Sequence, residues 1–303
     1  MEKSLSRSDY LFAVMFIFML VLALGAFFSG LKVGQERSAA KYEEQNARRS
    51  ESPKGYTSYD QQYLVSFYHT IYQPYREFHK KWFETMDGIS ANRSADASLL
   101  TKDLAKLAED TYATLSDKAM PDSSPLLQDS LQDYRKSLKL FGEALRSYTP
   151  KANARPGAEL TAQLENDSYI AQAKNFSLKA EKEFYDAILK WNETVNPQLK
   201  PVEFGNSLAL ADWSQLSLNR KNDYAAQMLL AGKQFKAFTP QDLTSRIDEM
   251  IASGQSKKMN LGDARQVADV LMATDAVRPG DFLRYKDRWY AKETLPQLPF
   301  FTN

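Results

Sequence analysis

The chain of 303 residues contains no cysteine, and its only histidines are His69 and His79. Without cysteine there are no disulfides, thiolate metal sites, iron–sulfur clusters, cysteine nucleophiles or lipid-modified cysteine anchors. On one helix, ten residues would separate the two imidazoles by roughly 15 Å along the axis and by about 80° around it. We therefore expect no metal site, and we expect both histidines to be ordinary helix residues near the surface or at its boundary.

Several common catalytic strings are also missing. The sequence has no Gly-x-Ser-x-Gly turn, no His-Glu-x-x-His helix, no phosphate-binding loop and no dinucleotide-binding glycine fingerprint. Carboxylate pairs such as Glu181 with Glu183 occur, but solvated helix faces often produce such pairs. We therefore predict no catalytic residue and no cofactor, and we rank an enzyme third among the function classes considered.

The chain also lacks an excess of charge of either sign, because 39 Lys and Arg residues face 38 Asp and Glu residues. Residues 239–293 could form two helices and a hairpin, as a winged helix does, but they hold nine basic and nine acidic side chains. A segment without net charge does not supply the phosphate attraction on which DNA affinity depends. We expect no nucleic-acid partner.

One long apolar run stands out among the residues that are present. Residues 10–31 are 22 residues without a charge, and about 20 apolar residues cross a bilayer as a helix. The alternative is a cleaved signal peptide, with Lys3 and Arg7 at its start and small residues at 23–25 as the cleavage site. The run continues past that site, which favours an uncleaved signal anchor. It predicts a transmembrane helix with the lipid bilayer as its partner.

The charges that flank this run give conflicting indications of topology. Basic residues lie on both sides, and their plain count favours a cytoplasmic C-terminus. A short basic start and the absence of cysteine favour export of the domain that follows. We predict a cytoplasmic tail at residues 1–9, a plasma-membrane location and an extracytoplasmic C-terminal domain, with a cytoplasmic domain as the alternative.

Helical periods dominate the rest of the chain. Residues 32–57 are polar and predict a stalk or linker, whereas residues 58–196 predict an all-α, four-helix bundle. Pro74 should kink the first helix. In the third helix, apolar residues from 127 to 148 alternate steps of four and three, as in a coiled coil. Antiparallel packing within one chain and association between chains both explain this seam, and we favour the former.

Residues 197–303 predict a smaller, mainly helical domain. Thr239, Pro240 and an acid at Asp242 form a helix start. Residues 282–290 predict a possible short β-hairpin. Residues 295–303 hold two prolines and predict a tail on the surface.

The aromatic side chains of the bundle form the candidate site, either as its core or as a pocket. They are Tyr63, Phe67, Tyr75, Phe78, Trp82, Phe184 and Trp191. A continuous stripe at steps of three and four is what burial requires, so we favour the core. We predict a non-catalytic protein for docking or scaffolding at the cell envelope, with an unknown protein partner. The alternative is an extracytoplasmic bundle that senses a small molecule.

Overall fold

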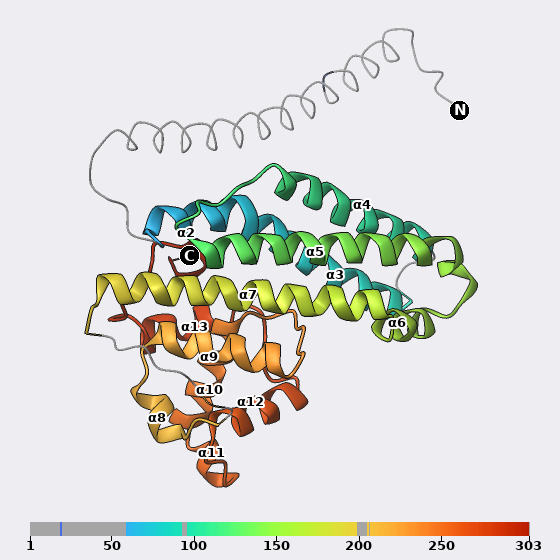
Figure 1. Ribbon diagram of the computed structural model, residues 1–303. Coiled ribbons are helices and arrows are strands. Elements are labelled where there is room, and N and C mark those ends of the chain that lie inside the picture. The colour runs from blue at the N-terminus through green and yellow to red at the C-terminus, as the bar shows by residue number, and fades with distance from the viewer. Residues whose placement is uncertain (1–18, 20–58, 93–95, 199–204, 206, 303) are drawn as a thin grey trace, which may run out of the picture. The chain divides into compact units, whose positions relative to one another are not determined.

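The computed structural model describes residue 19 and residues 59–92, 96–198, 205 and 207–302 (Figure 1). Residues 57–303 group into one compact unit. Helices make up most of this unit, which confirms the predicted all-α class. No strand occurs among the described residues beyond an isolated antiparallel bridge between Ala209 and Asp263.

The first half of the unit is built from long helices that pack side by side. Their bounds are α2 (Gln61–Phe67), the π-helix η1 (Tyr68–Tyr72), α3 (Gln73–Ser90), α4 (Ala97–Ser116), α5 (Pro125–Tyr148), the 3₁₀ helix η2 (Thr149–Ala154), α6 (Gly157–Glu165) and α7 (Ser168–Val195). The predicted helix over residues 158–195 is divided, because the Asp167 side chain accepts from the backbone N–H groups of Tyr169 and Ile170 and starts α7.

A π turn precedes Pro74, where the sequence predicted a kink. Proline has no N–H to donate to the carbonyl four residues back, so a regular α-helix would be interrupted here. The Gln73 N–H instead donates to the Tyr68 carbonyl, five residues back. The wider turn adds one residue to the helical repeat, and the neighbours Ile71 and Tyr72 are both buried as a result.

The heptad seam of helix α5 packs against other helices of the same chain. The seam residues are buried between α4 and α7 and are Leu127, Leu131, Tyr134, Leu138, Phe141 and Leu145. At the far end of the bundle, Gly157 lets α6 approach α3 closely. A Cβ atom on Gly157 would lie 1.9 Å from the Ile89 carbonyl oxygen, so any larger residue would push the two helices apart.

The second half of the unit consists of shorter helices, of which α9 packs on α7, as Figure 1 shows, and α10 packs on α9. They are α8 (Leu210–Gln215), α9 (Leu218–Ala231), α10 (Pro240–Ala252), α11 (Gln255–Lys258), α12 (Ala264–Ala273), α13 (Asp281–Trp289) and α14 (Pro299–Thr302). We call this part the C-terminal lobe. The capping box of Thr239 and Asp242 starts α10. Trp213, Leu243 and Val267 are at the centre of the lobe's own apolar cluster.

Two expectations for the C-terminal lobe are wrong. The predicted hairpin at residues 282–290 is helix α13, because Phe282, Tyr285 and Trp289 recur at helical rather than alternating spacing. The predicted surface tail is instead partly buried, with Leu298 and Phe301 inside the apolar core. Proline limits hydrogen bonding along this tail, but it does not prevent the apolar side chains from packing.

The prediction of a signal anchor in the plasma membrane also requires correction. Over the ranges that the structure describes, no helix is both long and apolar enough to cross a membrane. Even α7 and α5, with 28 and 24 residues, are amphipathic helices with a charged face. Residues 1–9, 10–31 and 32–57 lie outside the described ranges, apart from Met19. We therefore withdraw the transmembrane helix, its bilayer partner and the predicted side of the membrane.

Candidate functional site

The aromatic residues singled out from the sequence lie together in the bundle. Phe67, Tyr75, Phe78, Trp82, Phe184 and Trp191 are buried, and Tyr63 is half-buried beside them. The rings of Phe67 and Phe184 stack with centroids 4.7 Å apart. The centroids of Trp82 and Phe141 are 4.6 Å apart. These contacts join α2, α3, α5 and α7, and they use the aromatic stripe for packing.

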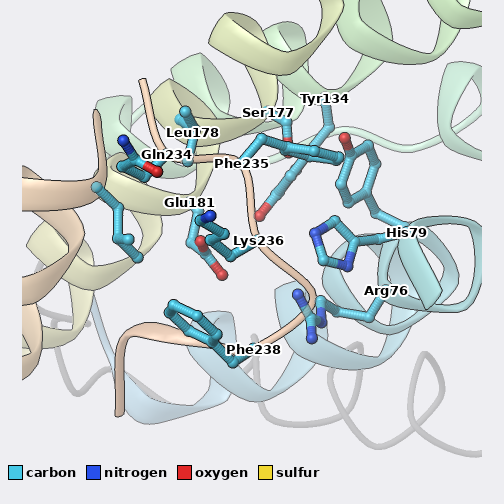
Figure 2. Close-up of a pocket in the computed structure, with 12 residues that line it drawn as sticks. Arg76, His79, Tyr134, Ser177, Leu178, Glu181, Gln234, Phe235, Lys236 and Phe238 are labelled. Atoms are coloured by element: carbon cyan, nitrogen blue, oxygen red, sulfur yellow. The ribbon is translucent and has the colours of Figure 1, made fainter. Parts of the chain in front are cut away.

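A polar cavity lies where the C-terminal lobe covers this aromatic core. Its volume is about 10 Å³, room for roughly one water molecule. Helices α3, α5 and α7 form most of the wall, and α9 with the segment between α9 and α10 forms the rest (Figure 2). The polar side chains of the lining are Tyr75, Arg76, His79, Tyr134, Ser177, Glu181, Gln234 and Lys236.

Arg76 and Glu181 bring opposite charges to two walls of the cavity (Figure 2). The Arg76 Nη2 atom donates to the Ala237 carbonyl at 3.2 Å, and the Tyr72 hydroxyl donates to Glu181 Oε1 at 3.4 Å. Burial raises the pKa of the Glu181 carboxyl to about 7, although the positive charge of Arg76 opposes the shift. Glu181 can therefore exchange a proton near neutral pH.

His79 is buried, whereas the sequence predicted a position near the surface or at its boundary. Its exposed fraction is 4%, and its ring meets the edge of Phe235 at a centroid distance of 4.7 Å. Burial lowers its pKa well below the ordinary value, and Arg76 adds to this shift, so the imidazole is neutral. Within the described ranges, its Nδ1 atom has no hydrogen-bond partner. His69 is exposed, as expected.

Tyrosine hydroxyls complete the polar layer. The hydroxyl groups of Tyr75 and Ser137 share a hydrogen bond with an O···O distance of 2.9 Å. The ring centroids of Tyr75 and Tyr134 lie 4.2 Å apart. Tyr185 donates to Gln241 at the start of α10. Burial raises the pKa of Tyr72, Tyr75, Tyr134 and Tyr185, which keeps these phenols neutral. The bond from Tyr185 to Gln241 and the bond from Arg76 to the Ala237 carbonyl thus join the bundle to the lobe beside the titratable Glu181.

Most of this layer was not predicted from the sequence. Arg76 and Glu181 have the spacing of ordinary polar residues on amphipathic helices. The segment that covers them is distant in the sequence, because Ala237, which accepts the hydrogen bond from Arg76, lies 161 positions further along the chain. The one available signal was Pro74, because π turns are frequent at functional sites. Among the described residues there is no group of three or more His, Asp or Glu side chains suited to a metal ion.

Comparison of the chain with protein-family models, with curated proteins and with solved structures gave no match.

Proposed function

We propose that this protein is a non-catalytic docking or scaffolding protein, whose helical framework holds a recognition surface for a protein partner. The observation that carries the proposal is the filled interior. The aromatic side chains that could have lined a pocket contact one another instead, and the space left beside them is about 10 Å³. Pockets for small molecules occupy about 300–1,000 Å³. Recognition is therefore assigned to the outer surface.

The contacts between the two halves support a rigid framework. Lys182 on α7 pairs with Asp223 on α9 at 3.2 Å. The Arg76 guanidinium donates a hydrogen bond to the Ala237 carbonyl in the segment before α10. Phe300 near the C-terminus packs against Tyr68 and Tyr72, with centroids 5.4 and 5.7 Å away. Such cross-links between distant segments resist local opening, so they hold the surface residues in fixed positions.

A photo-crosslinking scan tests the docking proposal. Four exposed apolar residues on different faces would each be replaced in turn by a photoreactive amino acid. The positions are Leu99, Tyr169, Met259 and Leu283, all about half exposed. In the native host, we expect one face to give a protein adduct of defined mass while the other positions stay at background. If no position gives an adduct above background, the proposal is wrong.

The cavity favours one second candidate, a bundle that senses a small polar molecule. Arg76, His79 and Glu181 offer a cation, an unpaired ring nitrogen and a titratable acid around one space. The cavity would have to open before anything larger than water could enter. A panel of small carboxylates and phosphates should raise the melting temperature of the wild-type chain, and Arg76→Gln should abolish that rise. Without such a rise, sensing is rejected.

A further inference from the structure

Helix α13 carries a layered cluster of aromatic and guanidinium groups on the outside of the C-terminal lobe. The rings of Tyr285 and Trp289 stack with centroids 4.6 Å apart and planes 5° from parallel. The Cζ atom of Arg284 lies 5.7 Å from the Tyr285 centroid, and that of Arg288 lies 5.7 Å from the Trp289 centroid. We call these four side chains the α13 stack. Both guanidiniums gain from the negative faces of the rings.

Contacts from behind hold the α13 stack in place. Arg246 Nη1 donates to the Tyr285 hydroxyl at 3.0 Å. Arg246 is itself fixed by the Ala276 carbonyl at 3.0 Å and by Glu249 at 3.1 Å. Trp289 packs against the apolar core on its inner side. The rings are therefore ordered before any partner arrives, which lowers the entropy cost of binding.

The outer side of the same helix is open and basic. The side chain of Arg284 is 69% exposed, Arg288 is exposed, and Leu283 beside them is 47% exposed. Arg284 has one contact of 3.3 Å with the buried carboxylate of Asp281. A guanidinium that stacks on a ring keeps its in-plane N–H groups available, and these match a carboxylate in a two-point contact.

We infer that the α13 stack is the docking surface for an acidic segment of a partner protein, an inference that rests on the proposed docking function. Tryptophan, tyrosine and arginine are the residues that dominate binding energy at protein interfaces. Leu283 would contact an apolar side chain of the segment, while Arg284 and Arg288 bind its carboxylates. Lys286 on the same helix and Lys292 in the segment after it add positive charge to this region.

Charge favours a polypeptide over a nucleic acid as the occupant. The exposed carboxylate of Asp287 lies within the basic face, and the whole chain is nearly balanced in charge. Nucleic-acid affinity depends on many simultaneous phosphate contacts. A short acidic segment needs only a few carboxylates at the positions of the two arginines.

The first experiment measures binding to the full-length chain by fluorescence anisotropy. The probe is a short labelled peptide in which Glu alternates with Leu, and its control has Gln at each Glu position. We expect the Glu peptide to bind more tightly than the Gln peptide. The double variant Arg284→Gln/Arg288→Gln should bind the Glu peptide with an affinity about ten-fold lower or more. Equal affinity for the two peptides would overturn the inference.

A matched variant separates the site from general charge. Lys257→Gln/Lys258→Gln removes the same charge from two exposed positions on α11, in the same lobe, and it should retain the wild-type affinity. An equal loss in both double variants would reject the α13 stack. Tighter binding to a single-stranded oligonucleotide than to the Glu peptide would also reject it and favour a nucleic acid. Unchanged melting temperatures show that both double variants are folded.

The crosslinking positions separate this inference from the docking proposal. An adduct at Leu283 that disappears with Arg284→Gln/Arg288→Gln and persists with Lys257→Gln/Lys258→Gln supports both. A defined adduct at Leu99, Tyr169 or Met259 without one at Leu283 keeps the docking proposal and overturns the α13 stack. No adduct at any of the four positions removes the docking proposal itself.

Discussion

The α5 seam and the junction beneath the C-terminal lobe are both buried, but they are built from different side chains. Along the seam, Leu138, Phe141 and Leu145 are fully buried and apolar. At the junction, Arg76, His79 and Glu181 surround a cavity about the size of one water. Apolar packing is tolerant of direction, whereas a hydrogen-bonded layer is satisfied in one arrangement only. The seam therefore contributes stability through burial, and the junction fixes how the lobe sits on the bundle.

The largest expected loss of stability comes from placing a charge in the α5 seam. Leu138→Asp places an unpaired carboxylate at a position with 0% exposure, and we expect it to unfold the chain, a loss above about 4 kcal/mol. Glu143→Ala, at an exposed position of the same helix, should melt like the wild type. Circular dichroism melting of the pair is the measurement. Similar melting curves would show that the seam is not buried.

The next largest effect should come from the aromatic core. Trp82→Ala removes a side chain that is 1% exposed, and truncating a large buried aromatic costs about 3–5 kcal/mol of unfolding free energy. Tyr112→Ala on α4 is the control, because its side chain reaches the solvent. Urea titrations would measure both free energies. A Trp82→Ala protein with wild-type stability would contradict the role of Trp82 in the core.

A smaller and more local effect is expected at the junction. Arg76→Gln removes the bond to the Ala237 carbonyl and the positive charge near Glu181, with an expected cost of about 1–3 kcal/mol. Hydrogen exchange of the amides at 232–239 should become faster while α5 stays protected. Arg146→Gln, at an exposed ion pair with Glu109, should leave both regions unchanged. Equal acceleration throughout would show that the junction is not a separate unit.

The smallest expected effect depends on pH and tests the acid at the junction. The pKa of Glu181 in the folded state is about 7, which is above its ordinary value. This shift contributes stability that is fully present when the pH is below the ordinary pKa, and the contribution is lost as the pH rises through 7. The shift of His79 acts in the opposite direction, but it is common to both proteins.

The melting temperature of Glu181→Gln, relative to that of the wild type, should therefore rise by a few degrees between pH 5 and pH 8. A change of 1 kcal/mol corresponds to about 2–4 °C in a chain of this size. Glu84→Gln, on the exposed face of α3, is the control. A difference that stays constant with pH would show that Glu181 is not titrating at the junction.

Several parts of the candidate site follow from neighbouring residues alone. The steps of three and four residues between Tyr75, Phe78 and Trp82 indicate a helix with one aromatic face, since helix periodicity is a local property. His79 follows Phe78 at the edge of that face, where the same periodicity predicts a boundary position. The bundle alone leaves such a position at the boundary, and Phe235 of the C-terminal lobe covers it.

Periodicity, proline and capping residues act within a few positions, so most of the helices, their buried faces and the start of α10 can be predicted from the sequence. The absence of cysteine chemistry also follows from the sequence. Three features appear only in the folded chain: the cavity shared by Arg76, His79 and Glu181, the insertion of Phe301 into the core, and the hydrogen bond from Arg246 to the Tyr285 ring that stacks on Trp289. These arrangements join segments far apart along the chain, and their energies arise only once the helices have packed.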